Sequence, residues 1–382
     1  VPIGAFLSGG LDSSIIVALA AAGGPTVRTF SVTFDEPAYD ESPYSDWVAR
    51  RFATRHSEIR LRPCEFAGWL PEAVDAMDQP SFDGVNTYCV SRAAKAAGLT
   101  VALSGLGGDE TFGGYPFFNT VPWVDRCARL AAASPAPARR FLSRQLGRRG
   151  FRVSAPWKLA EAWGSNGARP APPALPAYQA AQILFPEWVR RRLISADAVG
   201  DGGSLVYSLP GLLVEQLRAE AEAAGPGNLV SLYALRLFLG ERCLRDTDAM
   251  SMAVSLEVRP VFTDHRFLEA AWKVPAARRC RGAPDKPFLW SLFRPLLGDD
   301  FPVRRKQGFR LPLDEWLRAA ATRAWIGETL ANRALLESVG LAPDAVNGLL
   351  EAYRKNRPKI PWSRLWAVFV LARWCQKNRV TL

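Results

Sequence analysis

The sequence is poor in the residues that build metal sites and disulfide frameworks. Its 382 residues include six cysteines and two histidines. The cysteines lie far apart and form no Cys-x-x-Cys pair or Cys/His cluster, which argues against a structural zinc site and a disulfide scaffold. We expect both histidines to be structural rather than catalytic, with His56 beside a predicted strand and His265 at a turn.

Long apolar runs are also missing. The longest one near the C-terminus, Leu365–Leu371, is flanked by Arg364 and Arg373 and is too short to span a bilayer. We therefore interpret the aromatic stretch Trp362–Trp374 as a packing helix and expect no membrane partner. No secretion signal is recognisable, so we expect a cytoplasmic protein. Because Val1 stands inside an apparent strand, we also expect the chain to be a fragment or one domain of a longer protein.

Lysine is scarce, although the chain is strongly basic. The net charge is +11, and only eight of the 48 cationic side chains are lysines. A charge of this size permits nucleic-acid binding, but the arginines are spread along the chain and no RNA-binding module is recognisable. We interpret most arginines as solvated surface that helps to attract anions. A nucleic-acid-binding face is the less favoured alternative.

A glycine loop, Ser8-Gly9-Gly10-Leu11-Asp12-Ser13-Ser14, directly follows the apolar run 3–7. Glycine lets the backbone approach a phosphate closely, because no Cβ intervenes. The first N–H groups of the helix that follows have no intrahelical partners and would point at the anion. No Gly-Lys-Ser/Thr follows, which excludes a Walker A loop. The pattern indicates a phosphate site, and a plain glycine turn is the alternative.

Residues 1 to about 115 alternate between strand-like and helix-like segments. Strands separated by helices predict an α/β fold, a parallel sheet with helices on both faces. In such sheets ligands bind beyond the carboxyl ends of the strands. The predicted strands are 3–7, 26–34, 56–61 and 100–103, and the predicted helices are 15–22, 42–53 with Ser42 as N-cap, 65–77 and 88–97.

A second glycine loop follows the strand predicted over 100–103. It reads Ser104-Gly105-Leu106-Gly107-Gly108-Asp109-Glu110 and continues to Phe112-Gly113-Gly114-Tyr115. Five glycines around an acidic pair would place carboxylates beside a closely approached backbone. A glycine-rich turn with its charges facing water is the alternative. For Glu110 and for Glu257 two roles stay open: packing a buried arginine such as Arg259, or ordering the site.

The rest of the chain changes character twice. Residues 119–180 are rich in alanine, proline and arginine, and we interpret them as an irregular insertion. Residues 181–382 are mainly helical and are expected to complete the site begun by residues 1–118. The helices predicted there are 213–224, 229–244, 267–273, 286–296 and 313–325.

A basic motif, Arg304-Arg305-Lys306-Gln307-Gly308-Phe309, lies between two of these helices. Its lysine is informative because arginine is the usual cation of this chain. A compact ammonium acts as a point charge on a phosphate, whereas a guanidinium acts as a planar fork. A basic surface loop is the alternative.

Four motifs, in one order along the chain, resemble the synthetase domain of glutamine-hydrolysing asparagine synthetases. They are the two glycine loops, the stretch 246–259 with Asp246-Thr247-Asp248 and Leu256-Glu257-Val258-Arg259, and the lysine motif 305–309. The likeness runs from residue 1 to the C-terminal tail and is weakest over 120–230. It implies the adenine nucleotide α-hydrolase-like fold of ATP pyrophosphatases, with ATP and Mg²⁺ as cofactors. A homodimer is compatible with it.

The resemblance also implies roles for single positions. Lys306 matches a catalytic lysine that stabilises charge on the α-phosphate, and Asp12 and Asp109 match carboxylates that hold Mg²⁺, an ion suited to hard oxygen ligands. The positions that match ATP and pyrophosphate contacts are Leu7, Ser8, Gly9, Gly10, Asp12, Ser13, Val32, Ser104 and Gly105. The substrate-side candidates are Leu106, Asp246 and Asp248.

The activity implied by the resemblance is that of an amide-forming ligase. ATP would adenylate aspartate to β-aspartyl-AMP with release of pyrophosphate, and ammonia would displace AMP to give asparagine. Two other interpretations stay open. One is a relative that adenylates another carboxylate and closes a β-lactam or a peptide macrolactam. The other is a tRNA-modifying or nucleic-acid-binding ATP pyrophosphatase, against which the absence of a cysteine pair argues.

Three departures from the family pattern bear on the substrate. Leu106 replaces a glutamate implicated in forming the aspartyl-adenylate, and leucine can neither accept a proton nor bind an ammonium group. The family's Val-Pro-Phe-Leu-Asp is rearranged to Pro260-Val261-Phe262-Thr263-Asp264. The glutaminase domain, with its N-terminal cysteine nucleophile, is absent from this chain. We therefore expect ammonia from a glutaminase domain upstream or on a separate chain, or from another source.

Overall fold

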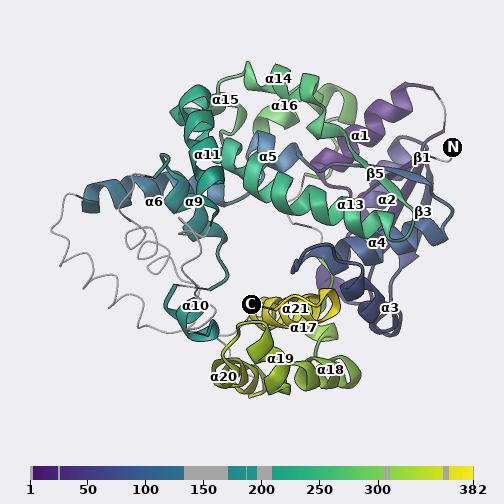
Figure 1. The fold of residues 1–382 in the computed structure, drawn as a ribbon. Coiled ribbons are helices and arrows are strands. Elements are labelled where there is room, and N and C mark those ends of the chain that lie inside the picture. Colours follow the sequence, from purple (N-terminus) through teal and green to yellow (C-terminus); the bar gives the residue numbers. More distant parts are fainter. Residues whose placement is uncertain are drawn as a thin grey trace. The chain divides into compact units, whose positions relative to one another are not determined.

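The computed structural model describes residues 3–24, 26–132, 171–185, 187–195, 209–303, 308, 310–355 and 361–381 (Figure 1). The chain divides into two compact units. The sheet unit combines Val1–Tyr115 with Ala234–Thr322, and the helical unit combines Pro116–Tyr233 with Arg323–Leu382. Each unit is therefore built from two separate stretches of the chain.

A parallel sheet of five strands, in the order β3-β2-β1-β4-β5, lies at the centre of the sheet unit. In β1, Ala5 pairs with Thr29 of β2 on one side and with Leu103 of β4 on the other. The four predicted strands and their parallel arrangement are confirmed. The strands are β1 Ile3–Phe6, β2 Arg28–Thr33, β3 Arg55–Arg60, β4 Val101–Ser104 and β5 Glu257–Pro260. The sequence does not predict β5, because this edge strand has only four residues and none of them is fully buried.

Helices cover both faces of the sheet, as predicted. On one face, the helices α1 Leu11–Ala22, α2 Ser42–Arg51 and α16 Pro287–Leu297 pack their apolar side chains around Ala5 and Leu7. On the other face, a buried cluster consists of Phe30, Ala94 from α4 (Gly84–Ala96), Leu99, Ala102 and Leu256. Ala102 of β4 belongs to the cluster around Phe30, whereas its neighbour Leu103 packs against the cluster around Ala5. Successive side chains of a strand point to opposite faces of the sheet.

The remaining helices of the sheet unit are mostly short. The predicted N-cap at Ser42 is wrong, because Ser42 is already the first residue of α2 and its N–H donates to Asp40 Oδ1 at 2.9 Å. α3 packs against α4. The bounds are η1 Pro37–Tyr39, α3 Pro63–Asp75, α5 Gly108–Phe112, α13 Arg245–Met252, η5 Val261–Thr263, α14 His265–Trp272, α15 Ala276–Arg279 and α17 Leu313–Trp316.

A π-helix, Ala234–Leu244, runs directly into α13. Such wide turns are rare and often mark functional sites. The sequence predicts a helix over 229–244, but the spacing of apolar residues does not distinguish this pitch from an α-helix. The ring of Phe238 lies 5.3 Å from that of Tyr115. The π-helix is thus in contact with the end of the second glycine loop.

The C-terminal helix α21 (Trp362–Asn378) is buried in the helical unit. Trp366 and Phe369 are fully buried, and the ring of Phe369 lies 4.8 Å from that of Trp325. Arg364 is also buried, and its Nε donates to the carbonyl of Leu184 at 2.9 Å. The packing role predicted for the C-terminal stretch is confirmed. Within the described part of the chain, no helix is both long enough and apolar enough to cross a membrane.

The insertion predicted over 119–180 belongs to the helical unit. The helix α6 (Phe117–Ala132) covers its start, α9 (Leu175–Gln182) its end, and residues 133–170 lie outside the described part of the chain. α6 and α9 pack together through Phe117 and Tyr178, whose rings are 5.6 Å apart. The other elements of this unit are α10 Glu187–Leu193, α11 Gly211–Ala224, η3 Pro226–Asn228, α12 Leu229–Tyr233, α19 Arg333–Ser338 and α20 Pro343–Arg354.

The single helix predicted over 313–325 is wrong, because two helices, α17 and α18 (Ala320–Ala331), share this region. The N–H groups of Arg318 and Ala319 donate to carbonyl groups three residues back, which tightens the chain and ends α17.

His56 lies on β3 and is held by two hydroxyl groups of β2. Its Nδ1 is 2.9 Å from Thr29 Oγ1, and its Nε2 is 3.1 Å from Ser31 Oγ. Burial lowers the pKa of His56, which Asp46 and Glu58 oppose through their charges. The hydrogen bonds expected of a structural histidine are therefore present.

Two leucines of α16 give a matched test of its packing. Leu289 is fully buried in the cluster around Ala5 and Leu7, whereas Leu292, about one turn further along α16, is 54% exposed. Leu289→Ala should lower the free energy of unfolding by about 2–5 kcal/mol, because it leaves a cavity. Leu292→Ala should change it by less than about 0.5 kcal/mol. Urea titrations of both variants check this, and equal losses would contradict the packing described for α16.

Candidate phosphate-binding site

The two glycine loops meet at the carboxyl edge of the sheet. The first loop connects β1 to α1, and the second connects β4 to α5. Because β1 and β4 are parallel neighbours, both loops leave the sheet on the same side. A Cβ added at Gly108 would lie 2.7 Å from Asp12 Oδ1, and one added at Gly105 would lie 3.0 Å from Asp12 Cβ. The glycines of the second loop therefore let it close onto Asp12.

The first loop is folded on itself by its serines. Ser8 Oγ lies 3.2 Å from Ser13 Oγ, and the hydroxyl of Ser13 donates to the carbonyl of Gly10 at 3.0 Å. Gly9 has φ +70°, and a Cβ there would lie 2.4 Å from the backbone of Tyr44. Gly10 is the N-cap residue of α1 and has no side chain to cap the helix. The first-turn N–H groups of α1 therefore keep no intrahelical acceptor and suit an anion.

Lys286 joins the acidic residues of both loops. It precedes α16 in a left-handed conformation, with φ +50°, and it is only 3% exposed. Its Nζ donates to Asp109 Oδ1 at 2.7 Å and, in a still shorter contact, to Asp12 Oδ2. Burial alone would lower the pKa of Lys286, but the charges of Asp12 and Asp109 outweigh it and raise the pKa above its usual value. The ammonium group is therefore charged at neutral pH.

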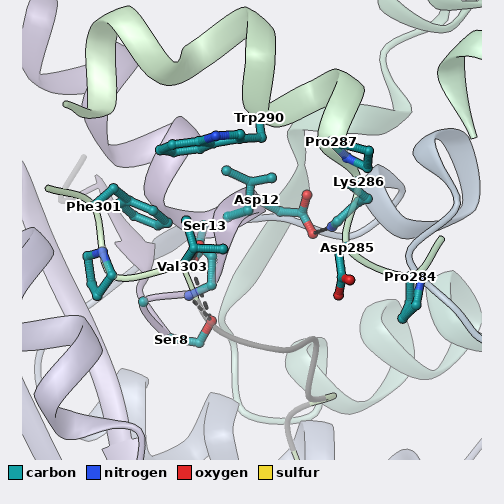
Figure 2. A pocket seen from close by; sticks show the side chains of 14 residues that line it. Ser8, Asp12, Ser13, Pro284, Asp285, Lys286, Pro287, Trp290, Phe301 and Val303 are labelled. Atoms are coloured by element: carbon teal, nitrogen blue, oxygen red, sulfur yellow. Dashed lines mark hydrogen bonds and ion pairs between the residues drawn. The ribbon is translucent and has the colours of Figure 1, made fainter. Parts of the chain in front are cut away.

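A cavity of about 220 Å³ opens beside this group of charges. Ser8 to Ser13 line one side of it, and Pro284 to Pro287 line another. Trp290, Phe301 and Val303 add an apolar wall. Figure 2 shows the side chains of Asp12 and Lys286 directed toward one another at the edge of this cavity. The cavity thus combines helix N–H groups, the buried ammonium of Lys286 and the carboxylates of Asp12 and Asp285, whereas Asp109 contacts the ammonium without lining the cavity.

Asp12 and Asp109 are also the residues that fit a divalent cation. Both carboxylates accept from one ammonium group, which shows that their oxygens converge on a single point of positive charge. Among the described residues, no group of three or more His, Cys, Asp or Glu side chains could hold a metal ion. A cation bound by these two carboxylates would need its other oxygen ligands from a phosphate or from water.

The other predicted ATP contacts lie around the same strand ends. Leu7 and Val32 are buried at the carboxyl ends of β1 and β2, and Ser104 is the last residue of β4. Ser104 Oγ accepts from the N–H of Leu106 at 3.4 Å, and Leu106 is half-buried. The predicted catalytic Lys306 lies outside the described residues. The roles of all these residues stay predictions.

The predicted substrate-side aspartates differ in their surroundings. Asp248 is exposed, whereas Asp246 is 5% exposed and accepts from Ser81 Oγ at 2.5 Å. Burial raises the pKa of Asp246 to about 6. Burial also raises the pKa of nearby Asp83, which Arg242 opposes through its charge. Ser81, Asp83, Arg242 and Asp246 form what we call the polar cluster.

Arg242 is held in the polar cluster by aromatic rings. Its guanidinium carbon lies 4.0 Å from the ring centre of Phe238 and 5.0 Å from that of Phe82. Contacts of this kind attract a cation to the face of a ring. Arg242 belongs to the π-helix, so this unusual element places a positive charge beside Asp83 and Asp246.

The two glutamates whose roles the sequence leaves open have different partners. Glu110 is 1% exposed and accepts from the hydroxyl of Tyr115 at 3.0 Å, so it orders the second glycine loop. Glu257 forms an ion pair with Arg259 at 2.7 Å, and both side chains are exposed. The buried arginine beside the loop is Arg279, whose guanidinium donates to the carbonyl of Thr111 at 2.6 Å.

Lys286 is the residue of this site that sequence reasoning misses. It lies 177 positions from Asp109 and 274 from Asp12, inside a segment predicted only as the start of a helix. The scarcity of lysine, used to single out Lys306, applies equally to Lys286 and is the signal that could have found it.

Comparison with known proteins identifies the family of this chain. The family model for asparagine synthase matches residues 1–376. The chain belongs to the asparagine synthase family.

Individual relatives are distant in sequence. Asparagine synthetase [glutamine-hydrolyzing] 1 of Bacillus subtilis (strain 168) is 25% identical over 384 residues, covering 99% of this chain and 56% of the relative. A putative asparagine synthetase of Mycobacterium tuberculosis (strain ATCC 25618 / H37Rv) is 28% identical over 387 residues, covering 98% and 54%. This chain thus spans just over half the length of these two relatives.

Replacing Asp246 with asparagine tests the burial of its carboxyl group. Between the ordinary pKa of 3.8 and the folded value of about 6, the folded state binds more protons than the unfolded state. The wild type should therefore gain up to about 3 kcal/mol in unfolding free energy, relative to Asp246→Asn, as the pH falls from about 7 to about 4.

The matched control is Asp248→Asn, at an exposed position on the same helix, which should follow the wild type across this pH range. Urea titrations at several pH values measure the difference. Equal pH dependence of the wild type and Asp246→Asn would contradict a pKa of Asp246 that is raised by burial.

Proposed function

We propose that this chain is an ATP-dependent amide-forming ligase that makes asparagine from aspartate and ammonia. Aspartate would be activated as β-aspartyl-AMP, with release of pyrophosphate, and ammonia would displace AMP. The observation that carries the proposal is the meeting of Asp12, Asp109 and Lys286 beside a loop whose helix N–H groups suit an anion. Membership of the asparagine synthase family supports it.

The chemistry explains why such a site is needed. A carboxylate acylates poorly because oxide is an impossible leaving group, and adenylation replaces oxide by AMP. The protein has to align the carboxylate with the α-phosphate and neutralise the charge that develops there. We assign the alignment of the phosphates to the loop Ser8–Ser13, and the positive charge to Lys286 and Lys306.

Magnesium fits the carboxylates of this site. Asp12 and Asp109 would hold the ion, which supplies positive charge to the phosphates when it is bound. The two residues reach the site from different loops, and the close approach at Gly105 and Gly108 sets their separation.

A second candidate function follows from Leu106. This residue is half-buried at the second loop, and an apolar side chain there offers neither a base nor a partner for an ammonium group. The chain would then adenylate a carboxylate other than aspartate and close an amide with an amine of the same molecule, as in a β-lactam or a peptide macrolactam. The polar cluster, with its buried Asp246, offers charges that could orient such a substrate.

The ammonia source and the setting of the chain are parts of the same proposal. Because the chain spans just over half of its relatives, we propose that a glutaminase domain, upstream or on a separate chain, supplies ammonia by hydrolysing glutamine. The substrates are small soluble molecules, so we place the reaction in the cytoplasm.

Exchange of labelled pyrophosphate into ATP tests the adenylation step. With Mg²⁺ and aspartate present, the chain should catalyse exchange, and it should form asparagine when ammonium is added. Lys306→Ala should reduce the exchange at least about 100-fold, because it removes the positive charge that we assign to the reacting phosphate. Lys377→Ala, at an exposed position on α21, is the control and should retain exchange.

The choice of acid decides between the two functions. Exchange with aspartate supports asparagine synthesis and shows that Leu106 is tolerated. Exchange only with another carboxylate contradicts aspartate as the substrate and supports the second candidate. Absence of exchange with every acid tested would contradict both.

A further inference from the structure

The carboxylates of Asp12 and Asp109 already have a cation between them. The ammonium of Lys286 is buried, charged and hydrogen-bonded to both. A pair of carboxylates that converge on one point repel each other unless a positive charge lies between them. In this structure a side chain of the protein itself supplies that charge.

A divalent cation and the Lys286 ammonium compete for the same place. An ion that binds one oxygen of Asp12 and one of Asp109 at the short Mg²⁺–oxygen distance must lie between the two carboxylates. The ammonium lies at that point, in hydrogen bonds with both groups. Two cations at this separation repel strongly in a buried site, so entry of the ion requires the lysine to leave.

The two carboxylates alone do little to favour replacement of the Lys286 ammonium by Mg²⁺. With Lys286 in place, two negative charges are already opposed by one positive charge, and the described residues offer no third acidic ligand. Mg²⁺ also gives up its bound water reluctantly. A bound phosphate favours the replacement in two ways. Its oxygens ligate the ion, and they also accept hydrogen bonds from the displaced ammonium.

The structure leaves room for the lysine to make this change. Lys286 is the N-cap residue of α16, and its carbonyl accepts from the N–H of Trp290 at 3.0 Å, so the change requires movement of the side chain only. Its side chain borders the cavity of about 220 Å³ on whose other side lie the loop residues Ser8 to Ser13. A rotation of its flexible four-carbon stem would carry the ammonium from the carboxylates to a phosphate held by that loop.

We propose that the Lys286 ammonium occupies the cation position between Asp12 and Asp109 and excludes Mg²⁺ from it until a phosphate ligand draws the lysine away. The inference rests on the proposed function for the presence of a phosphate substrate. Its consequence is coupled binding: the divalent cation and the phosphate bind together. The two carboxylates then face the divalent cation, and the lysine faces the phosphate, so that every charge keeps a partner of opposite sign. Lys286 is then a positioning residue for the metal.

Binding of Mn²⁺, followed by electron paramagnetic resonance, tests this without any nucleotide or carboxylate substrate. The wild type should bind Mn²⁺ weakly, and inorganic pyrophosphate should tighten the binding. Lys286→Met keeps the length of the side chain and removes its charge, so it should bind Mn²⁺ alone about 10- to 100-fold more tightly than the wild type. Pyrophosphate should then enhance the binding less than it does in the wild type.

Two further variants locate the effect. Lys286→Met combined with Asp109→Asn should lose the gained affinity, because one ligand is gone. Lys95→Met, which removes an ammonium that donates to the carbonyl of Ser255, should bind Mn²⁺ like the wild type. Equal Mn²⁺ affinity of Lys286→Met and the wild type would overturn the proposal.

A measurement on the wild type keeps the test valid if Lys286→Met does not fold. The ¹⁵N signal of the Lys286 ammonium should stay unchanged when Mg²⁺ alone is added and shift when Mg²⁺ and pyrophosphate are added together. A full shift with Mg²⁺ alone would overturn the proposal. Failure of pyrophosphate exchange with every acid would instead contradict the proposed function, and these binding readouts do not depend on that reaction.

Discussion

One buried ammonium, shared by two carboxylates, is the interaction on which the site depends. Asp12 and Asp109 come from the two glycine loops, and Lys286 comes from the start of α16, far away in the chain. Each charge alone would be costly to bury, and removal of one partner would leave the others uncompensated. Together they fix α1, α5 and the start of α16 at one point, so the charges that serve the proposed chemistry also hold its framework together.

The sheet and the glycines explain how these charges can meet. Parallel pairing of β1 with β4 brings both loops to one edge, and the absence of side chains at Gly105 and Gly108 lets the second loop reach Asp12. Gly114 has the same role toward Asp109, since a Cβ there would overlap the carboxylate. The glycines therefore allow two negative charges to lie close together, and the ammonium of Lys286 offsets the repulsion between them.

The sequence predicts the parts of this arrangement that have local signals. Apolar runs identify four strands and glycines identify both loops, because burial and positive φ angles restrict the residue types that occur at such positions. Lys286 has no such local signal, since its partners are far away in the chain and only the tertiary fold brings them together. The pitch of the π-helix and the burial of Asp246, in contrast to Asp248, depend in the same way on packing that periodicity does not encode.

The most direct measurement of the shared ammonium is a double-mutant cycle on the free energy of unfolding. Urea titrations of the wild type, Asp109→Asn, Lys286→Met and the double variant give the coupling between the two side chains. Because Lys286→Met leaves two carboxylates facing each other, the double variant should lose about 1–3 kcal/mol less than the sum of the single losses. Losses that add to within about 0.5 kcal/mol would show that the two charges are independent, which would contradict the central role of this interaction.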